Sequence, residues 1–280
     1  MNNEPSLSEL SGESTYRAPR SLEINEVSLN GDADVKEIAP GKFERKGGYF
    51  RKRLLAGRTN RDEKPEEVNL GKSISVVFLK IRRRLVERAD KGEIIRSTSE
   101  HNSKTDAVTL YDSRTKQSVR GVAEDLRKVH EGLRTVQIVY ALLLDGTKEP
   151  ELVRITIKGA SLGSEAKAEG VPTFYQYISS FPREAHMWEY VTELSAIVEE
   201  GAKSYFAINF QQGEKLDPET LALAEAKLRE VAQNCRDVDE ARAAKIVQGA
   251  KVEIATAQES DEESDAPAST DDDILNNIPF

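Results

Sequence analysis

Two kinds of side chain that together bind single-stranded nucleic acid are interleaved in one part of the chain. Cations can follow the phosphates of a strand, and bases can stack on aromatic rings at about 1–3 kcal/mol per base. The candidate nucleic-acid-binding residues form three groups: Tyr49, Phe50, Arg51, Lys52 and Arg53; Phe78, Lys80, Arg82 and Arg84; and Arg96, Tyr111, Arg114 and Lys116. This pattern predicts a surface that holds single strands without reading their sequence.

Each of these residues also has a purely structural interpretation. Aromatic rings on strands such as Phe78 and Tyr111 commonly belong to a hydrophobic core. A pair of arginines such as Arg82 and Arg84 is harder to bury, because an unpaired buried charge is very costly. We therefore expect these two arginines to be either exposed or paired.

The charge of the chain is segregated along its length. The formal net charge is −9, yet residues 42–136 hold 24 Lys and Arg against 14 Asp and Glu. The flanking blocks are acidic, and the stretch from Glu259 onward contains eight Asp and Glu and no Lys or Arg. A basic block inside an acidic protein indicates polyanion binding better than the overall charge does. An ordinary solvated face is the alternative interpretation.

The sequence offers no catalytic signature. It has no GxxxxGK[ST] phosphate loop, no GxGxxG and no HExxH. The single cysteine, Cys235, favours a reducing compartment, and three separated histidines give no familiar metal-ligand spacing. We therefore expect a binding protein rather than an enzyme, with no metal and no cofactor.

The sequence also lacks membrane and secretion signals. No apolar run approaches the roughly 18 residues that a membrane span needs. The N-terminus has neither the basic nor the apolar region of a secretory signal. We expect no membrane association and a cytoplasmic location, in a bacterial cell or in its host if the source is viral.

The C-terminus, DDDILNNIPF, joins three carboxylates to an apolar end. Such an end suits capture by another protein, with a pocket for Phe280 and basic residues around its carboxylate. The candidate partner-binding residues are Asp271, Asp272, Asp273, Ile278, Pro279 and Phe280. An acidic solubilising tail that ends in Phe by chance is the alternative.

This tip resembles the C-terminus of bacterial single-stranded-DNA-binding proteins, in which an Asp run leads into Ile-Pro-Phe. The chain departs from that pattern because Leu275, Asn276 and Asn277 separate the first Ile from the final Ile-Pro-Phe. The resemblance implies a body that coats single-stranded DNA during replication, recombination or repair. It also implies a tail that recruits replication and repair proteins.

The hydrophobic pattern divides the chain into a body, residues 42–250, and two disordered ends, residues 1–41 and the acidic tail 251–280. The first ordered segment is expected at 49–55, followed by strands at 73–86, 94–98, 107–111, 136–144 and 152–158. In strand 73–86, alternation places Phe78 on the face of Lys80, Arg82 and Arg84, with a bulge near Arg83. A helix of about fourteen residues is expected from an N-cap at Ser118, on the stripe formed by Val122, Leu126, Val129 and Leu133.

The order strand, strand, strand, helix, strand, strand is that of an OB-fold. We therefore expect a mainly β (α+β) fold, with an OB-like five-stranded barrel, a further strand pair and C-terminal helices. The added elements are a short aromatic helix at 172–181, strands at 188–198 and 204–210, and helices that begin at Asp217-Pro218 and at Val238. The aromatic helix and the strand pair are similar to late elements of phage-type single-strand-binding proteins.

Two other functions fit the same residues. An RNA-binding or transcription-associated module would use the same basic groove. A non-enzymatic adaptor or phage structural protein would pair its basic block with acidic protein. The sequence leaves homo-oligomerisation open.

Overall fold

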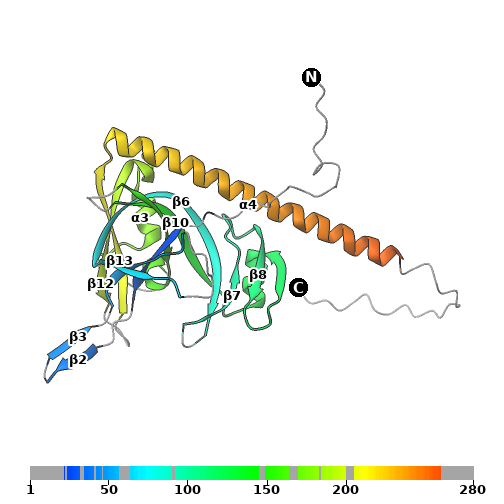
Figure 1. Cartoon of the computed structure of the whole chain (residues 1–280), viewed down its shortest axis with the longest axis horizontal. Helices are drawn as coiled ribbons and strands as arrows, with labels where there is room; N and C mark the ends of the chain where they lie inside the picture. The colour runs from blue at the N-terminus through cyan, green and yellow to red at the C-terminus, as the bar shows by residue number, and fades with distance from the viewer. Residues whose placement is uncertain are drawn as a thin grey trace. The chain divides into compact units, whose positions relative to one another are not determined.

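The chain folds into a mainly β structure with flanking helices, as seen in a computed structural model (Figure 1). The structure describes residues 22, 24–31, 35–40, 42–45, 47–56, 64–89, 92–144, 149–163, 170–182, 184–199 and 205–259. Its strands are β1 (Asn25–Asn30), β2 (Val35–Ala39), β3 (Lys42–Arg45), β4 (Tyr49–Arg53), β5 (Glu67–Gly71), β6 (Ser73–Arg88), β7 (Ile94–Thr98), β8 (Ala107–Asp112), β9 (Ser118–Val122), β10 (Arg134–Leu144), β11 (Glu151–Ile157), β12 (Tyr190–Glu199) and β13 (Tyr205–Lys215). Its helices are α2 (Ala123–Val129), α3 (Phe174–Ser180) and α4 (Pro218–Glu259), with 3-10 turns at Gly159–Leu162 and Met187–Glu189.

Eleven of the described strands form one open, mixed sheet. The main path runs β5-β4-β1-β11-β10-β6-β7-β8-β9, and β12 pairs with both β6 and β13. The two end strands, β5 and β9, do not pair with each other within the described part of the chain, so the sheet is not closed. The closed five-stranded OB-like barrel expected from the order of elements is therefore not confirmed. The pair β2 and β3 forms a separate two-stranded sheet.

The long strand β6 joins two lobes of the sheet. It follows a pronounced curve (Figure 1) and pairs with β10 along one edge. On its other edge it pairs first with β12, at Ser73–Val76, and near its end with β7. We call the part built on β1, β4, β5 and β10–β13 the large lobe, and the part built on β7–β9 and α2 the small lobe.

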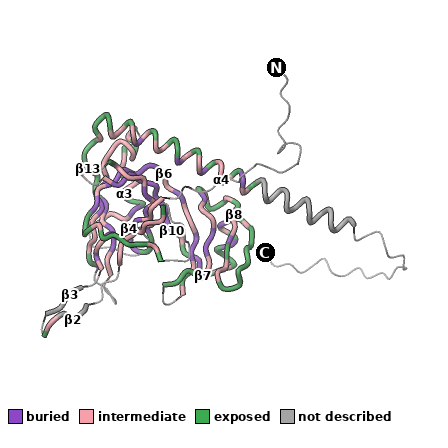
Figure 2. Tube along the Cα trace, viewed as in Figure 1, coloured by how far each residue is buried: buried purple, intermediate pink, exposed green. Residues whose placement is uncertain are grey.

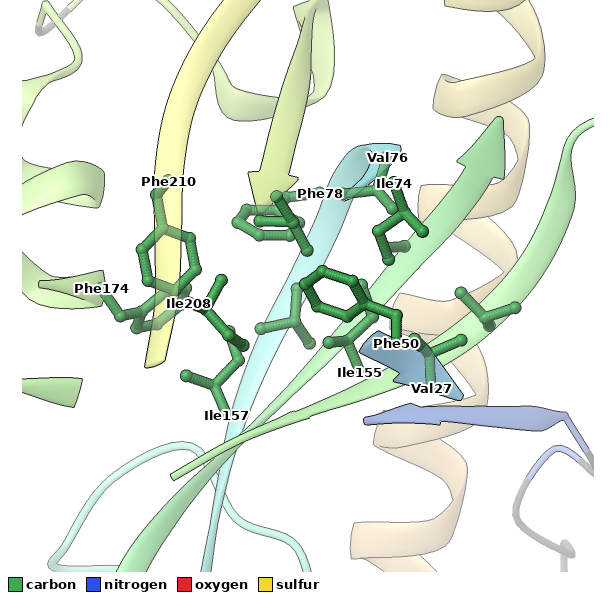
Figure 3. Close-up of a cluster of buried hydrophobic side chains, with 14 of the residues drawn as sticks. Val27, Phe50, Ile74, Val76, Phe78, Ile155, Ile157, Phe174, Ile208 and Phe210 are labelled. Atoms are coloured by element: carbon green, nitrogen blue, oxygen red, sulfur yellow. The ribbon is translucent and has the colours of Figure 1, made fainter. Parts of the chain in front are cut away.

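The large lobe has an aromatic and aliphatic core on the inner face of the sheet. Phe50, Phe78, Phe174 and Phe210 lie in it beside aliphatic residues of β1, β10 and β11 (Figure 3). The rings of Phe78 and Phe174 meet edge-on, with their centroids 6.1 Å apart. Helix α3 covers this core, and the side chain of Thr173 caps its first turn. The predicted aromatic helix is therefore present, and its Phe174 and Tyr177 rings pack inward.

A bulge in β6 sets which side chains face this core. Lys80 pairs with Tyr140 and Phe78 pairs with Ala141, so Leu79 is an extra residue on β6. An extra residue reverses the alternation of side chains beyond it. Phe78 therefore faces the inner core, whereas Lys80 faces the outer side of the sheet. The bulge lies about four residues before the position near Arg83 that alternation suggested.

The outer face of β6 and β10 is covered by the first part of α4. Ala224 of this helix packs on Val77, Leu79 and Leu142, and further along Val231 packs on the same face. Both faces of β10 are thus covered, which explains its continuous buried run from Val136 to Leu143 (Figure 2). The helix begins as predicted, because the side chain of Asp217 accepts hydrogen bonds from the backbone N–H groups of Glu219 and Thr220.

The small lobe differs from the prediction for residues 118–133. Ser118–Val122 forms the strand β9 rather than the first turns of a helix, and α2 has only seven residues. Val119 and Val122 favour a strand, and Gly121 disfavours a helix. Pairing with β8 then satisfies the backbone hydrogen bonds on one side of this segment. The core of the lobe consists of Leu85, Val108, Leu110, Ala123, Leu126 and Leu133.

Two segment boundaries also differ from those expected. β1 pairs with β4 and β11 inside the sheet, so the expected disordered segment 1–41 includes ordered structure. Only Val27 and Leu29 alternate there, which is too short a pattern to reveal a strand. The chain divides into two compact units, Arg20–Arg236 and a second unit that contains residues 237–259. In the second unit, residues 237–259 are one continuous helical stretch of α4, not a separate short helix followed by a tail from 251.

Candidate nucleic-acid interface

Strand pairing brings two predicted basic segments, on β4 and β6, onto one outer face of the sheet. Two rows of paired residues run across this face from β6 through β10, β11 and β1 to β4. They are Lys80, Tyr140, Arg154, Glu26 and Arg53, and Arg82, Ile138, Thr156, Ser28 and Arg51. Two further pairs on the same face are Arg84 with Val136 and Asn30 with Tyr49. Lys158 directly follows β11 and continues its outward alternation. Residues far apart in sequence therefore share one surface.

The β4 side of this face carries half-exposed cations. The guanidinium of Arg51 lies 3.4 Å from Glu67, and that of Arg53 lies 3.6 Å from Glu26 and 3.7 Å from Glu67. These ion pairs are partly solvated, and such pairs contribute little to stability. A phosphate can therefore replace the carboxylates at small cost. Tyr49 lies beside these cations on the same strand and is half-buried.

Lys158 adds an exposed cation to this group. The residue is exposed as a whole, but partial loss of water around its ammonium group lowers its pKa. The positive charges of Arg88 and Arg51 lower this pKa further, whereas Glu26 acts in the opposite direction. Cations from β4, β6 and β11 are thus close enough to repel one another. An anion bound there would relieve that repulsion.

Arg82 and Arg154 instead take part in a buried network around Glu100. The Arg82 guanidinium is 2% exposed and donates to the Glu100 carbonyl at 2.8 Å. Arg154 donates to one Glu100 carboxylate oxygen at 3.2 Å, and the Tyr140 hydroxyl donates to the other at 2.8 Å. Burial, reinforced by the Glu100 charge, raises the pKa of Tyr140. This hydroxyl therefore stays protonated and keeps its hydrogen bond.

Arg84 is also held by protein atoms. It donates to the Thr98 carbonyl at 3.0 Å and to the Ser97 hydroxyl at 2.9 Å. Burial, followed by the charge of Arg154, lowers its pKa. Arg84 thus joins β6 to the end of β7, and Arg82 joins it to Glu100 just beyond, so both arginines are paired. Lys80 is half-buried on the same face.

Three predicted contacts face away from the outer surface. Phe50 and Phe78 are completely buried in the large core, so neither ring is available for base stacking. Phe50 faces inward because it pairs with Leu29, and Phe78 does so because of the bulge at Leu79. The ammonium of Lys52 lies on the inner side, 2.7 Å from Glu151.

The remaining predicted residues lie in the small lobe, separated from β4 by at least four strands of the sheet. Arg96 forms ion pairs with Glu87 at 2.9 Å and Asp112 at 2.7 Å. Tyr111 is 41% exposed, and Arg114 and Lys116 are exposed on the β8–β9 turn. The predicted binding residues therefore do not form one surface. They form two separate groups, one on β4 and β11 and one on the small lobe.

Sequence reasoning missed the contribution of β11 to the basic face. Arg154, Thr156 and Lys158 alternate with the buried Val153, Ile155 and Ile157. That alternation is visible in the sequence and assigns both cations to one face. It went unused because the strand lies outside the basic block of residues 42–136.

The other predicted features have the following status. The six partner-binding residues of the tail, Asp271–Asp273 and Ile278–Phe280, lie outside the described residues. In the described part, no three His, Cys, Asp or Glu side chains gather where they could hold a metal ion. Among the described helices, none combines the length and apolar character needed to cross a membrane. Comparisons with protein-family models, with curated proteins and with solved structures found no match.

Proposed function

We propose that the protein binds single-stranded DNA through the outer face formed by β4, β1 and β11. The observation that supports this most directly is the register of β4, β1 and β11, which puts Arg51 and Arg53 on the same sheet face as Arg154, with one strand between them. Lys158 follows β11 on the same alternation. These cations come from segments about a hundred residues apart, yet they share one sheet face. The acidic tip of the chain also supports the proposal, because it resembles the tip of single-stranded-DNA-binding proteins.

Binding would follow from exchange of weak ion pairs for phosphate contacts. Arg51 and Arg53 would leave Glu67 and Glu26, and Lys158 would gain an anionic neighbour. Release of counterions from the strand then supplies much of the affinity and makes it depend on salt. Tyr49, on the same face, offers an aromatic surface for one base. Nothing in this arrangement reads base edges, so we expect little sequence preference.

We further propose that the tail binds replication or repair proteins. The ring and terminal carboxylate of Phe280 would enter a pocket with a basic rim, and Asp271–Asp273 would attract that rim over a longer range. This part of the proposal rests on the sequence alone. The protein would then hold single strands with its body and recruit other proteins with its tail, without catalysing a reaction.

The test of the DNA-binding face is the variant Arg51→Ala/Arg53→Ala/Lys158→Ala. Its matched control removes the same charge from exposed cations elsewhere, at Lys104, Lys215 and Arg229. We expect the first variant to weaken binding to a single-stranded oligonucleotide and to reduce the slope of log affinity against log salt by about 2, since each phosphate contact contributes roughly 0.7. The control should keep the wild-type slope. Equal behaviour of the two variants would remove this face from consideration.

The same titrations separate the alternatives. Stronger binding to RNA than to DNA of equal length would favour the RNA-binding module. Salt-insensitive failure to bind any oligonucleotide would favour the adaptor or structural protein.

The tail is tested separately, with a chain extended by one Lys after Phe280. The extension moves the terminal carboxylate and adds a cation while it leaves the acidic run unchanged. We expect it to reduce capture of replication and repair proteins from a bacterial lysate, as deletion of residues 271–280 should. Undiminished capture by the extended chain would show that Phe280 is not a terminal hook.

A further inference from the structure

The small lobe ends in a strand with one open edge. Among the described strands, β9 pairs only with β8, so the main-chain groups on its other side have no strand partner. An open edge of this kind is a template for pairing with another chain, and proteins usually protect such edges with charges, proline or a bulge. In β9 the only charged residue is Arg120, and the strand contains no proline.

Apolar side chains gather at this edge. Leu110 of β8 is buried in the core of the small lobe, but its direct neighbour on β9, Val119, is 53% exposed. Val129, at the end of α2, is 74% exposed, and Val122 is also exposed. Val122 and Val129 belong to the apolar stripe of this segment, whose other members, Leu126 and Leu133, are buried. Val119 thus continues the apolar core of the small lobe to the edge, and Val122 and Val129 are also open to solvent.

The opposite end of the sheet is protected. β5 begins with Glu67, which forms ion pairs with Arg51 and Arg53, and the ladder between β4 and β5 is interrupted by a bulge. Val68 of β5 is 37% exposed, but it lies next to these charges. The β9 edge therefore differs from the β5 edge in having few charges and several exposed valines.

The charges of α2 indicate what covers this edge. The first turn of the helix carries Glu124 and Asp125, and the last turn carries Arg127 and Lys128. A twofold axis perpendicular to the sheet would reverse the direction of α2 in a second copy. Within one copy Asp125 pairs with Lys128 at 3.4 Å and Glu124 pairs with Lys104 at 3.6 Å, and these side chains are exposed. Where the two α2 helices approach each other across the axis, such exposed pairs can exchange partners between copies, and the surface would be complementary to itself.

We propose that two copies of this chain pair through their β9 edges, antiparallel and about a twofold axis. The charge of Arg120 restricts the register. A twofold axis beside Arg120 would place Arg120 of one copy opposite Arg120 of the other, and two like charges opposite each other are destabilising. A twofold axis beside Val119 instead places Val119 opposite Val119 of the second copy, and Arg120 opposite Ser118 of the second copy. Val119 of each copy becomes buried between the two small lobes. This dimer does not depend on the proposed DNA-binding face.

The experiment measures the mass of the full-length protein by sedimentation equilibrium as concentration is raised. We expect the wild type to approach twice the 31.1 kDa of one chain. Val119→Glu should remain a monomer, whereas Val119→Ile, which keeps an apolar β-branched side chain, should dimerise. Val68→Glu, an equivalent change on the other end strand, should dimerise like the wild type. Circular dichroism and melting of each variant check the fold, and an exposed valine can be replaced with little loss of stability.

A second set of variants tests the helix charges. Asp125→Lys and Lys128→Asp should each weaken the dimer, because each places like charges in contact. The double variant Asp125→Lys/Lys128→Asp should recover much of the affinity, since both copies then exchange signs together. The proposal is overturned if the wild type remains a monomer up to its solubility limit. It is also overturned if Val119→Glu dimerises as well as the wild type does, or if Val68→Glu alone abolishes the dimer.

Discussion

The two lobes that share β6 place their apolar side chains differently. The large lobe surrounds Phe50 and Phe78 completely, whereas the small lobe leaves Val119 and Val129 largely in solvent. The large lobe has strands on several sides of its core and a helix over it, while the small lobe has three short strands and a seven-residue helix. Phe50 and Phe78 of the large lobe therefore serve packing, whereas Tyr111 of the small lobe remains available for contacts.

The sharpest test of this difference is Phe78→Ala. Phe78 has no exposed surface and contacts the rings of Phe174 and Tyr177. Truncation of such a residue should lower the free energy of unfolding by about 3–5 kcal/mol, because it removes buried surface and leaves a cavity. Urea denaturation measures the loss. A stable variant with weakened oligonucleotide binding would instead return Phe78 to the DNA-binding surface.

A smaller loss of stability is expected for substitutions in the ion-pair network that connects the two lobes. Arg82→Met removes the buried cation that holds the Glu100 carbonyl, and should cost about 3 kcal/mol. Lys80→Met, on the same face of β6 but half-buried, should change stability by less than about 1 kcal/mol. Equal losses from both substitutions would show that the Glu100 network does not join the lobes. The free energy of unfolding of both variants decides this.

The junction between the lobes should also respond to pH through His101. Its backbone pairs with Arg83, and burial lowers the pKa of its ring. Asp106 opposes this shift, and Arg82 and Arg83 add to it. The unfolded chain then takes up this proton first, near pH 6.5, so stability is complete above that pH and declines as the pH falls below it.

We expect His101→Gln, which cannot become charged, to flatten this decline. The measurement is the urea midpoint of wild type and variant above and below pH 6.5. The acidic groups Asp106, Asp112 and Asp217, whose pKa values are lowered, respond only at more acidic pH and do not obscure the result. A variant that loses as much stability as the wild type would show that His101 is not the group responsible.

The smallest effect on stability is expected for Tyr111→Ala. Its ring is 41% exposed, so we expect a change within about 0.5 kcal/mol. If the small lobe also contacts a DNA strand, the same substitution should weaken binding by about 1–3 kcal/mol. Melting temperature and oligonucleotide affinity, measured together, separate the two. A loss of stability as large as that of Phe78→Ala would contradict the contrast between the lobes.

Most strands of the body can be predicted from the sequence because their pattern is local. Residues 94–98 and 107–111 alternate between polar and apolar side chains and are bounded by turns, and they become β7 and β8. The helix expected from Ser118 could not be assigned correctly from its apolar stripe. Val119, Gly121 and Val122 fit a strand, and only pairing with β8 decides between the two structures.

The candidate site depends on features that a single segment does not reveal. A one-residue bulge at Leu79 turns Phe78 inward and Lys80 outward, and nothing in the local sequence marks Leu79 as the extra residue. The joining of β4 to β11 through β1 likewise depends on pairing between distant segments. Charge and residue type therefore selected candidate cations, but only the register could show which of them share a surface.

The parallel pair β1 and β11 also constrains the order in which the protein folds. β1, β4 and β5 form a local antiparallel unit, and β1–β11 is its only ladder to the rest of the sheet among the described strands. Val27 and Ile155, which pair across that ladder, are 128 positions apart (155 minus 27). During synthesis, the first strands leave the ribosome long before their partner exists, and contacts so distant in sequence form slowly. We expect this N-terminal unit to dock last, on a sheet already assembled around β6 and β10.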